Sequence, residues 1–261
     1  MLIVLYLGLG AVAGLLAGMF GVGGGLIIVP ALLSVFAYSG FNSAILMQMA
    51  IATSLSTIVF TSLVSSYAHY RRGAIIWRDI GRLTPGIIIG AVSGPFIADR
   101  LASEWLQNAF AIFEILIAIQ ILLAPTLPRN VTQPKTGVLM TGGLVTGLLS
   151  SLLGIGGGTI TVPLLLSCGR TITQAVASAA ACGFPIAVTS ALFYLAAGLD
   201  ESVLPAQSWG YIYWPAMLYI TIASVLFAPL GARWAHTLPV EQLKKIFGIL
   251  LLIIGTRMLL Y

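Results

Sequence analysis

A glycine-rich stretch inside apolar sequence occurs twice in this chain, and it limits what the chain can fold into. Residues 14–33 are GLLAGMFGVGGGLIIVPALL and residues 147–166 are GLLSSLLGIGGGTITVPLLL, at a constant offset of 133 residues. Pro30 and Pro163 follow the two glycine triplets at the same distance. Glycine reaches left-handed backbone conformations and proline removes a hydrogen-bond donor. The pattern therefore predicts a helix, a break and a second helix, twice.

Composition places this duplicated element in a membrane. Mean hydropathy is +1.06 and only 7% of the residues are charged, so long apolar runs dominate the chain. A helical span needs about 20 mostly apolar residues, and hydrocarbon tolerates no open sheet edge. We therefore expect an all-α integral membrane protein with the lipid bilayer as its partner. Residues 2–20 lack the basic start of a signal peptide, which predicts a retained helix.

The apolar runs divide the chain into two similar halves. We expect a first membrane repeat at residues 1–128, a linker at 129–135 and a second membrane repeat at 136–261. Each repeat should hold about four long helices, one of them in a glycine-broken hairpin. The expected helices are residues 2–20, 26–38, 44–70, 83–97 and 105–123, then 136–153, 159–167, 172–198, 213–234 and 243–260. The segments 71–82 and 199–210 are expected as loops.

The basic residues indicate how the repeats are oriented. Lys and Arg in short loops prefer the cytoplasmic side. If each broken element is a hairpin that returns to its starting side and the N-terminus lies outside, all of the 12 basic residues except Arg100 and Arg257 become cytoplasmic. If the two repeats instead run parallel, the excess of basic residues on the cytoplasmic side is much smaller. The sequence therefore predicts a multi-pass protein of the cell inner membrane with inverted-topology repeats. It does not distinguish a hairpin that crosses fully from one that enters partway.

The two breaks form a candidate anion site. A helix that starts at a glycine break presents unpaired N–H groups and the positive end of its dipole. Inverted repeats place such broken helices near the midplane in secondary transporters. The candidate substrate-binding residues are the two glycine triplets and nearby hydroxyls, namely Gly23, Gly24, Gly25, Gly156, Gly157, Gly158, Thr53, Ser54, Thr159 and Thr161.

These features also have structural interpretations. Glycines such as Gly14 and Gly18 more often serve close helix packing, and Ser and Thr in a span often bond the carbonyl one turn back. Glu114 is an acid within a span, so it is a candidate for coupling transport to protons. Pairing of Glu114 with a polar group on a neighbouring helix is an equal alternative.

Several other functions are disfavoured. Two distant histidines and a single intramembrane acid do not make an enzyme's nucleophile and base, so we expect no enzyme, no cofactor and no metal. The glycine run lacks the lysine of a nucleotide loop. Cys168 and Cys182 have no metal-ligand spacing, and the basic residues form no patch for nucleic acid. An anion channel remains an alternative to a carrier.

The doubled pattern GxxxGxxGxGGGxxxxPxLL resembles the sulfite exporter TauE/SafE family. It is complete in the first half, and Ser151 stands where Gly18 would repeat. Residues 52–55 with the stretch from Tyr67 to Gly73 are similar to that family's second-helix signature. The resemblance implies a permease for sulfur-containing anions such as sulfite or organosulfonates, working without ATP. A carrier for a non-sulfur organic anion is the further alternative. Neither the direction of transport nor the oligomeric state follows from the sequence.

Overall fold

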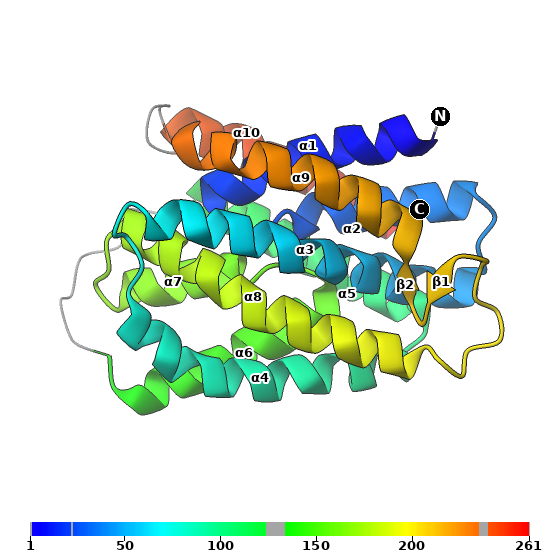
Figure 1. The fold of residues 1–261 in the computed structure, drawn as a ribbon, viewed down its shortest axis with the longest axis horizontal. Helices are drawn as coiled ribbons and strands as arrows, with labels where there is room; N and C mark the ends of the chain where they lie inside the picture. The colour runs from blue at the N-terminus through cyan, green and yellow to red at the C-terminus, as the bar shows by residue number, and fades with distance from the viewer. Residues whose placement is uncertain (1, 22, 124–133, 235–239, 261) are drawn as a thin grey trace.

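The structure, a computed structural model, describes residues 2–21, 23–123, 134–234 and 240–260. It is helical almost throughout (Figure 1). The helices are α1 (Leu2–Phe20), α2 (Gly25–Tyr38), α3 (Leu46–Tyr70), α4 (Trp77–Asp99), α5 (Ser103–Leu123), α6 (Thr136–Leu153), α7 (Gly158–Ser167), α8 (Ile172–Ala197), α9 (Trp214–Trp234) and α10 (Val240–Leu260). A short hairpin of β1 (Ser208–Trp209) and β2 (Ile212–Tyr213) precedes α9.

Seven of these helices are long and apolar enough to cross a membrane, by length and composition. They are α1, α3, α4, α5, α6, α8 and α9. The helix α10 is also 21 residues long, but Glu241, Lys244 and Lys245 occupy its first turns. In contrast, α2 has 14 residues and α7 has 10, roughly 21 Å and 15 Å of helix. Neither short helix spans a bilayer core of about 30 Å. The expected all-α integral membrane protein is confirmed.

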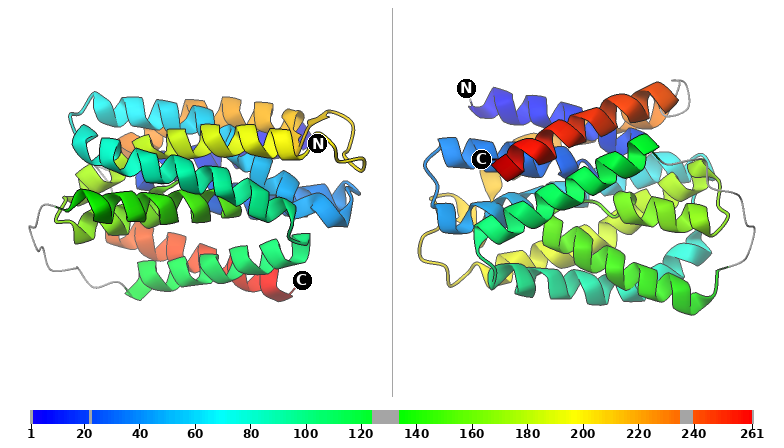
Figure 2. Two further views of the ribbon diagram at one scale, coloured as in Figure 1. Left: turned by 90° about the horizontal axis from the view of Figure 1, so that it is seen from below. Right: turned by 180° about the vertical axis from the view of Figure 1, so that it is seen from behind.

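Equivalent helices of the two halves run in opposite directions in Figure 1. The helix α1 runs against α6, α3 against α8, and α4 against α9. Helices also pair across the halves: α1 packs along α9 and α6 packs along α4, while α3 crosses α8 and α5 packs against α10. Both termini lie at the same end of the bundle, as the rear view in Figure 2 also shows. The halves are therefore interleaved. Residues 129–133 of the expected linker lie outside the described residues.

Glycine stripes bring the paired helices into backbone contact. A Cβ on Gly14 would lie 2.6 Å from the Cα of Ser224, and Gly10 and Gly18 meet α9 in the same way. On the other side of the molecule, Gly86 and Gly90 face the backbone of α6. Such small-residue stripes let membrane helices approach closely. The packing role expected for Gly14 and Gly18 is thus confirmed.

Two expected boundaries are wrong. The segment 71–82 is not all loop, because α4 begins at Trp77 rather than at residue 83. Asp79 lies in the first turn of α4, where a carboxylate is favourable beside the free N–H groups, and it pairs with Arg170. The segment 199–210 contains the strand β1, whose partner β2 follows a turn at Gly210 with φ +54°.

Candidate functional site

The two glycine breaks begin with the same backbone conformation. Gly21 follows α1 with φ +67°, and Gly154, its equivalent in the second half, follows α6 with φ +70°. A residue in this left-handed region ends a helix readily when it is glycine. The breaks then differ: Gly24 precedes α2 with φ +83°, whereas Gly157 precedes α7 with φ −57°. The second helix of each half therefore starts from a different geometry.

The two breaks touch each other inside the bundle. A Cβ on Gly23 would lie 2.9 Å from the Cα of Gly156, and Gly25 packs against the carbonyl of Gly154. The Ser54 hydroxyl on α3 donates to the same Gly154 carbonyl at 2.8 Å. Only glycine permits so close an approach of two backbones. The structure thus brings together the two triplets that the sequence singles out.

The starts of α2 and α7 present backbone N–H groups at the two breaks. The first N–H groups of a helix have no acceptor within that helix, and α2 begins at Gly25 and α7 at Gly158. The residues of both glycine triplets are buried except Gly23, which is partly buried. Buried amides are normally paired. Two helix starts that meet in the interior therefore bring together groups of the kind that bind anions in other proteins.

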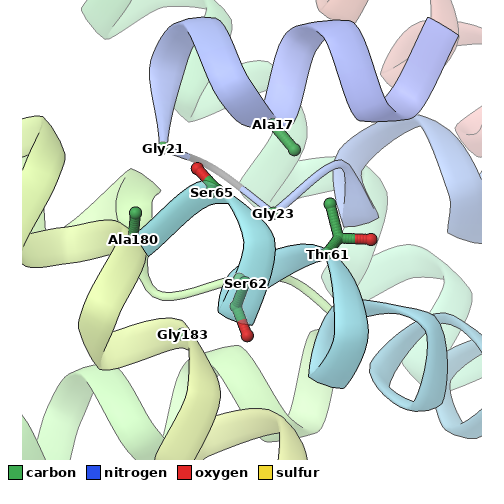
Figure 3. Close-up of a pocket in the computed structure, with 9 residues that line it drawn as sticks. Ala17, Gly21, Gly23, Thr61, Ser62, Ser65, Ala180 and Gly183 are labelled. Carbon is green, nitrogen blue, oxygen red and sulfur yellow. The ribbon is translucent and has the colours of Figure 1, made fainter. Parts of the chain in front are cut away.

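A small cavity lies beside the contact between the breaks (Figure 3). The cavity has a volume of about 10 Å³, which leaves room for roughly one water molecule. The Ser65 hydroxyl points toward the break at Gly21 (Figure 3), is buried, and has no hydrogen-bond partner in the structure. The cavity is lined by residues of α1, the two breaks, α3 and α8, namely Ala17, Gly21, Gly23, Thr61, Ser62, Ser65, Gly156, Ala180 and Gly183.

The predicted hydroxyl residues Thr53, Ser54, Thr159 and Thr161 do not line this cavity. Thr53 is far along α3, where its hydroxyl accepts a hydrogen bond from the Tyr213 amide at 3.0 Å. Thr159 and Thr161 are buried in the first turn of α7, and neither hydroxyl has a partner among the described residues. Ser65 lines the cavity but is not among the residues predicted from the sequence, because α3 carries Ser and Thr along most of its length. Which turn of α3 meets the breaks depends on where this helix crosses α8.

Glu114 stands apart from the cavity. Its side chain is fully buried on α5, and neither carboxylate oxygen has a hydrogen-bond partner in the structure. The neighbouring Ala111 and Ile115 pack against Gly255 of α10. In the described ranges, no group of three His, Cys, Asp or Glu residues could hold a metal ion. Cys168 and Cys182 are free thiols.

Polar contacts tie α4 to the second half near both of its ends. Close to its start, the buried Asp79 forms an ion pair with Arg170 at 2.7 Å. At its last residue, Asp99 accepts a hydrogen bond from the Tyr211 hydroxyl at 2.8 Å. Burial raises the pKa of Tyr211 above its ordinary value, and the bond to Asp99 adds to the shift. These contacts fix α4 beside the elements that carry the second break.

A helical membrane bundle with two broken helices meeting inside it has the architecture of a multi-pass membrane transporter. The chain belongs to the sulfite exporter TauE/SafE family, whose model matches residues 6–258. A probable membrane transporter protein of Haemophilus influenzae is 37% identical over 260 residues, covering 99% of this chain and 98% of that protein. A probable membrane transporter protein of Methanocaldococcus jannaschii is 27% identical, covering 96% of this chain and 93% of that protein. The probable membrane transporter protein YunE of Bacillus subtilis is 26% identical, with 96% and 95% covered. No solved structure matches.

Proposed function

We propose that this transporter is a secondary carrier for small sulfur-containing anions such as sulfite or organosulfonates. The observation that carries the proposal is the contact between Gly23 and Gly156, which brings together the breaks that precede the N-terminal ends of α2 and α7. Amide N–H groups donate but cannot accept, so they select an anion. The described spans place no Lys or Arg at the cavity. The name of the family, sulfite exporter, supports the sulfur chemistry.

The size of the cavity supports alternating access rather than an open pore. Space for about one water does not hold a sulfite ion, so the substrate enters only when helices around the breaks separate. The antiparallel crossing of α3 with α8 and the parallel packing of α1 along α9 join helices of the two halves, and we infer two interleaved units that move against each other about the site. We infer inverted repeats with the N-terminus outside, in the cell inner membrane, because this orientation places most basic residues in the cytoplasm.

Glu114 is proposed as the residue that couples transport to protons. A buried carboxylate without a hydrogen-bond partner is costly when charged, and intramembrane acids commonly carry protons in transporters. Replacement of Glu114 by Gln should leave exchange of substrate across the membrane intact while uptake no longer responds to a pH gradient. A Gln variant that still follows the gradient removes this role.

Counterflow tests the proposal. Purified protein in liposomes preloaded with sulfite should accumulate labelled sulfite from outside, since a carrier exchanges substrate across the membrane and a channel does not. A panel of sulfite, thiosulfate, sulfoacetate and acetate as competitors identifies the preferred anion. Flux without stimulation by internal sulfite would indicate the anion channel. Competition by acetate alone would indicate a carrier for non-sulfur organic anions.

A further inference from the structure

Four buried hydroxyls without partners gather at the second break. Thr146 and Ser150 lie one turn apart on α6, and Thr159 and Thr161 lie in the first turn of α7. Thr146, Ser150 and Thr161 are 0% exposed and Thr159 is 8% exposed. No hydrogen bond from any of the four hydroxyls is found among the described residues. By contrast, Thr141 on the same helix α6 bonds the carbonyl of Gly137 at 3.0 Å.

Gly157 lies between the hydroxyl-bearing side chains. A Cβ built on Gly157 would lie 3.3 Å from the Oγ1 of Thr161 and 3.4 Å from the Cγ2 of Thr146. Gly157 directly precedes α7, so the Thr161 hydroxyl lies beside the N–H groups at the start of this helix. A helix start alone is weak evidence for a ligand. Here, fully buried and unpartnered side chains accompany it.

At the first break, Gly24 contacts Ala13 as Gly157 contacts Thr146 at the second, but the surrounding side chains are apolar. A Cβ on Gly24 would lie 3.0 Å from the Cβ of Ala13, as Gly157 faces Thr146 at the equivalent position. At the constant offset of the repeat, the equivalents of the four hydroxyl residues are all apolar: Ala13, Ala17, Leu26 and Ile28. All four are buried. The fold therefore does not require hydroxyls at these positions, and their presence at one break needs another reason.

The chemistry of the donors selects an anion over a cation. Hydroxyl oxygens could ligate sodium, but amide N–H groups point hydrogen atoms at the ligand and would repel it. An oxyanion accepts from both kinds of group, and the positive end of the α7 dipole favours it further. Buried polar groups without partners are rare in native structures, so a ligand that completes them has a clear physical role.

We propose that the second break contributes more of the contacts to the oxyanion head of the substrate than the first, through the amides at Gly157 and the hydroxyls of Thr146, Ser150 and Thr161. This rests on the proposed function and makes the site asymmetric although the repeats are equivalent. Thr146 and Ser150 are then specificity-determining residues. Because the first break offers amides beside Ala13 and Ala17 only, the preferred substrate carries one group of three oxygens on sulfur, as in sulfite or methanesulfonate.

Isosteric substitutions test this assignment. Thr146→Val and Thr161→Val each remove a hydroxyl and keep the side-chain volume, and Thr141→Val is the matched control on the exposed face of α6. Equilibrium binding of sulfite and methanesulfonate is measured by calorimetry on the full chain in detergent. The expected result is about tenfold or greater weakening for Thr146→Val and Thr161→Val, as for a lost hydrogen bond to a charged group. Thr161→Ser, which keeps a donor, should retain most of the affinity.

The outcomes separate the inference from the function on which it rests. If Thr146→Val and Thr161→Val bind sulfite as tightly as the wild type, the asymmetric site is overturned and the proposed function still stands. Wild-type protein that binds neither anion overturns both. If the weakening disappears at saturating sodium, the hydroxyls bind a cation and the proposal is wrong. Equal binding by Thr161→Ser and Thr161→Val also contradicts it, because the loss then does not follow the hydroxyl.

Discussion

Arg170 donates two hydrogen bonds to Asp79, from Nε to Oδ2 at 2.7 Å and from Nη2 to Oδ1 at 3.0 Å. The pair joins the start of α4 in the first half to the connection between α7 and α8 in the second. Asp79 is fully buried, whereas the side chain of Arg170 is 26% exposed. A bidentate pair of a guanidinium and a buried carboxylate fixes the position and the orientation of both side chains. The contact therefore sets the distance between α4 and the helix that follows the second break.

Loss of this ion pair should destabilise the fold. We expect Asp79→Asn to lower the free energy of unfolding by about 3 kcal/mol, the lower end for a broken buried pair, because the partly exposed Arg170 can regain water. Asp200→Asn in the exposed loop after α8 is the matched control and should change little. Thermal unfolding in detergent measures both. Equal melting temperatures for the two variants would contradict the role given to the pair.

The contact between Tyr211 and Asp99 predicts an alkaline loss of stability. The folded state raises the pKa of Tyr211 by burial and by the bond to Asp99, whereas an unfolded tyrosine titrates near pH 10. This stabilisation is complete below about pH 10 and is lost as the pH rises toward the folded pKa. Tyr211→Phe should therefore lose less stability between about pH 9 and 11 than the wild type, as followed by melting temperature. Tyr38→Phe at an exposed position should behave like the wild type.

The glycine stripe of α1 offers a test of helix packing. Gly14→Val should cost about 1–3 kcal/mol, because the added atoms meet the backbone of Ser224 on α9. Gly8→Val on the same helix meets no atom within 4 Å and should be close to neutral. Chemical or thermal unfolding compares the two variants. Similar losses at both positions would mean that valine in α1, rather than the α1–α9 contact, causes the effect.

The breaks could be predicted from the sequence because their causes are local. The triplets at residues 23–25 and 156–158 interrupt apolar runs, and a proline follows each. The glycine that ends each first helix, Gly21 or Gly154, adopts a left-handed conformation that glycine reaches readily. That the two breaks would meet follows from pairing two similar halves. The exact match of α6 to residues 136–153 has the same local origin.

The lining of the cavity could not be predicted in the same way. The face of α3 carries hydroxyls along most of its length, so the sequence favours Thr53 and Ser54 as readily as Ser65. Thr53 instead bonds the amide of Tyr213, in a hairpin that the sequence does not predict. The early start of α4 at Trp77 likewise depends on a distant partner, because Arg170 pairs with Asp79 in its first turn.

The unpaired hydroxyl of Ser65 gives a prediction for transport. If it contacts the anion, Ser65→Ala should weaken sulfite binding about fivefold to tenfold, the loss of one hydrogen bond of about 1 kcal/mol or more. Ser39→Ala is the control, because that exposed hydroxyl bonds the carbonyl of Val35. Initial rates of sulfite exchange in liposomes report the change. Unaltered exchange in Ser65→Ala would remove this residue from the site.

A substitution that fills the cavity tests the site only if the glycine it replaces accepts a side chain without backbone strain. Gly24→Val is a poor choice, because Gly24 has φ +83° and any side chain there is strained. Gly157→Val would collide with the Cδ1 of Ile186, which lies 2.6 Å from the Cβ position. Gly183 is better suited: it lines the cavity, lies within α8, and its added Cβ would lie 3.3 Å from the Cβ of Ser62. Alanine is also the better helix former.

The most direct measurement is therefore sulfite counterflow by Gly183→Ala beside Gly137→Ala, an alanine placed in open space on α6. If the breaks and the adjoining cavity hold the anion, Gly183→Ala should lose at least 90% of the exchange rate, roughly a tenfold effect for about 1.4 kcal/mol of lost binding. Its melting temperature should stay close to that of the wild type, because Ser62 needs to shift by only a few tenths of an ångström, and Gly137→Ala should exchange normally. Full exchange by a folded Gly183→Ala protein would contradict an anion site between the two breaks.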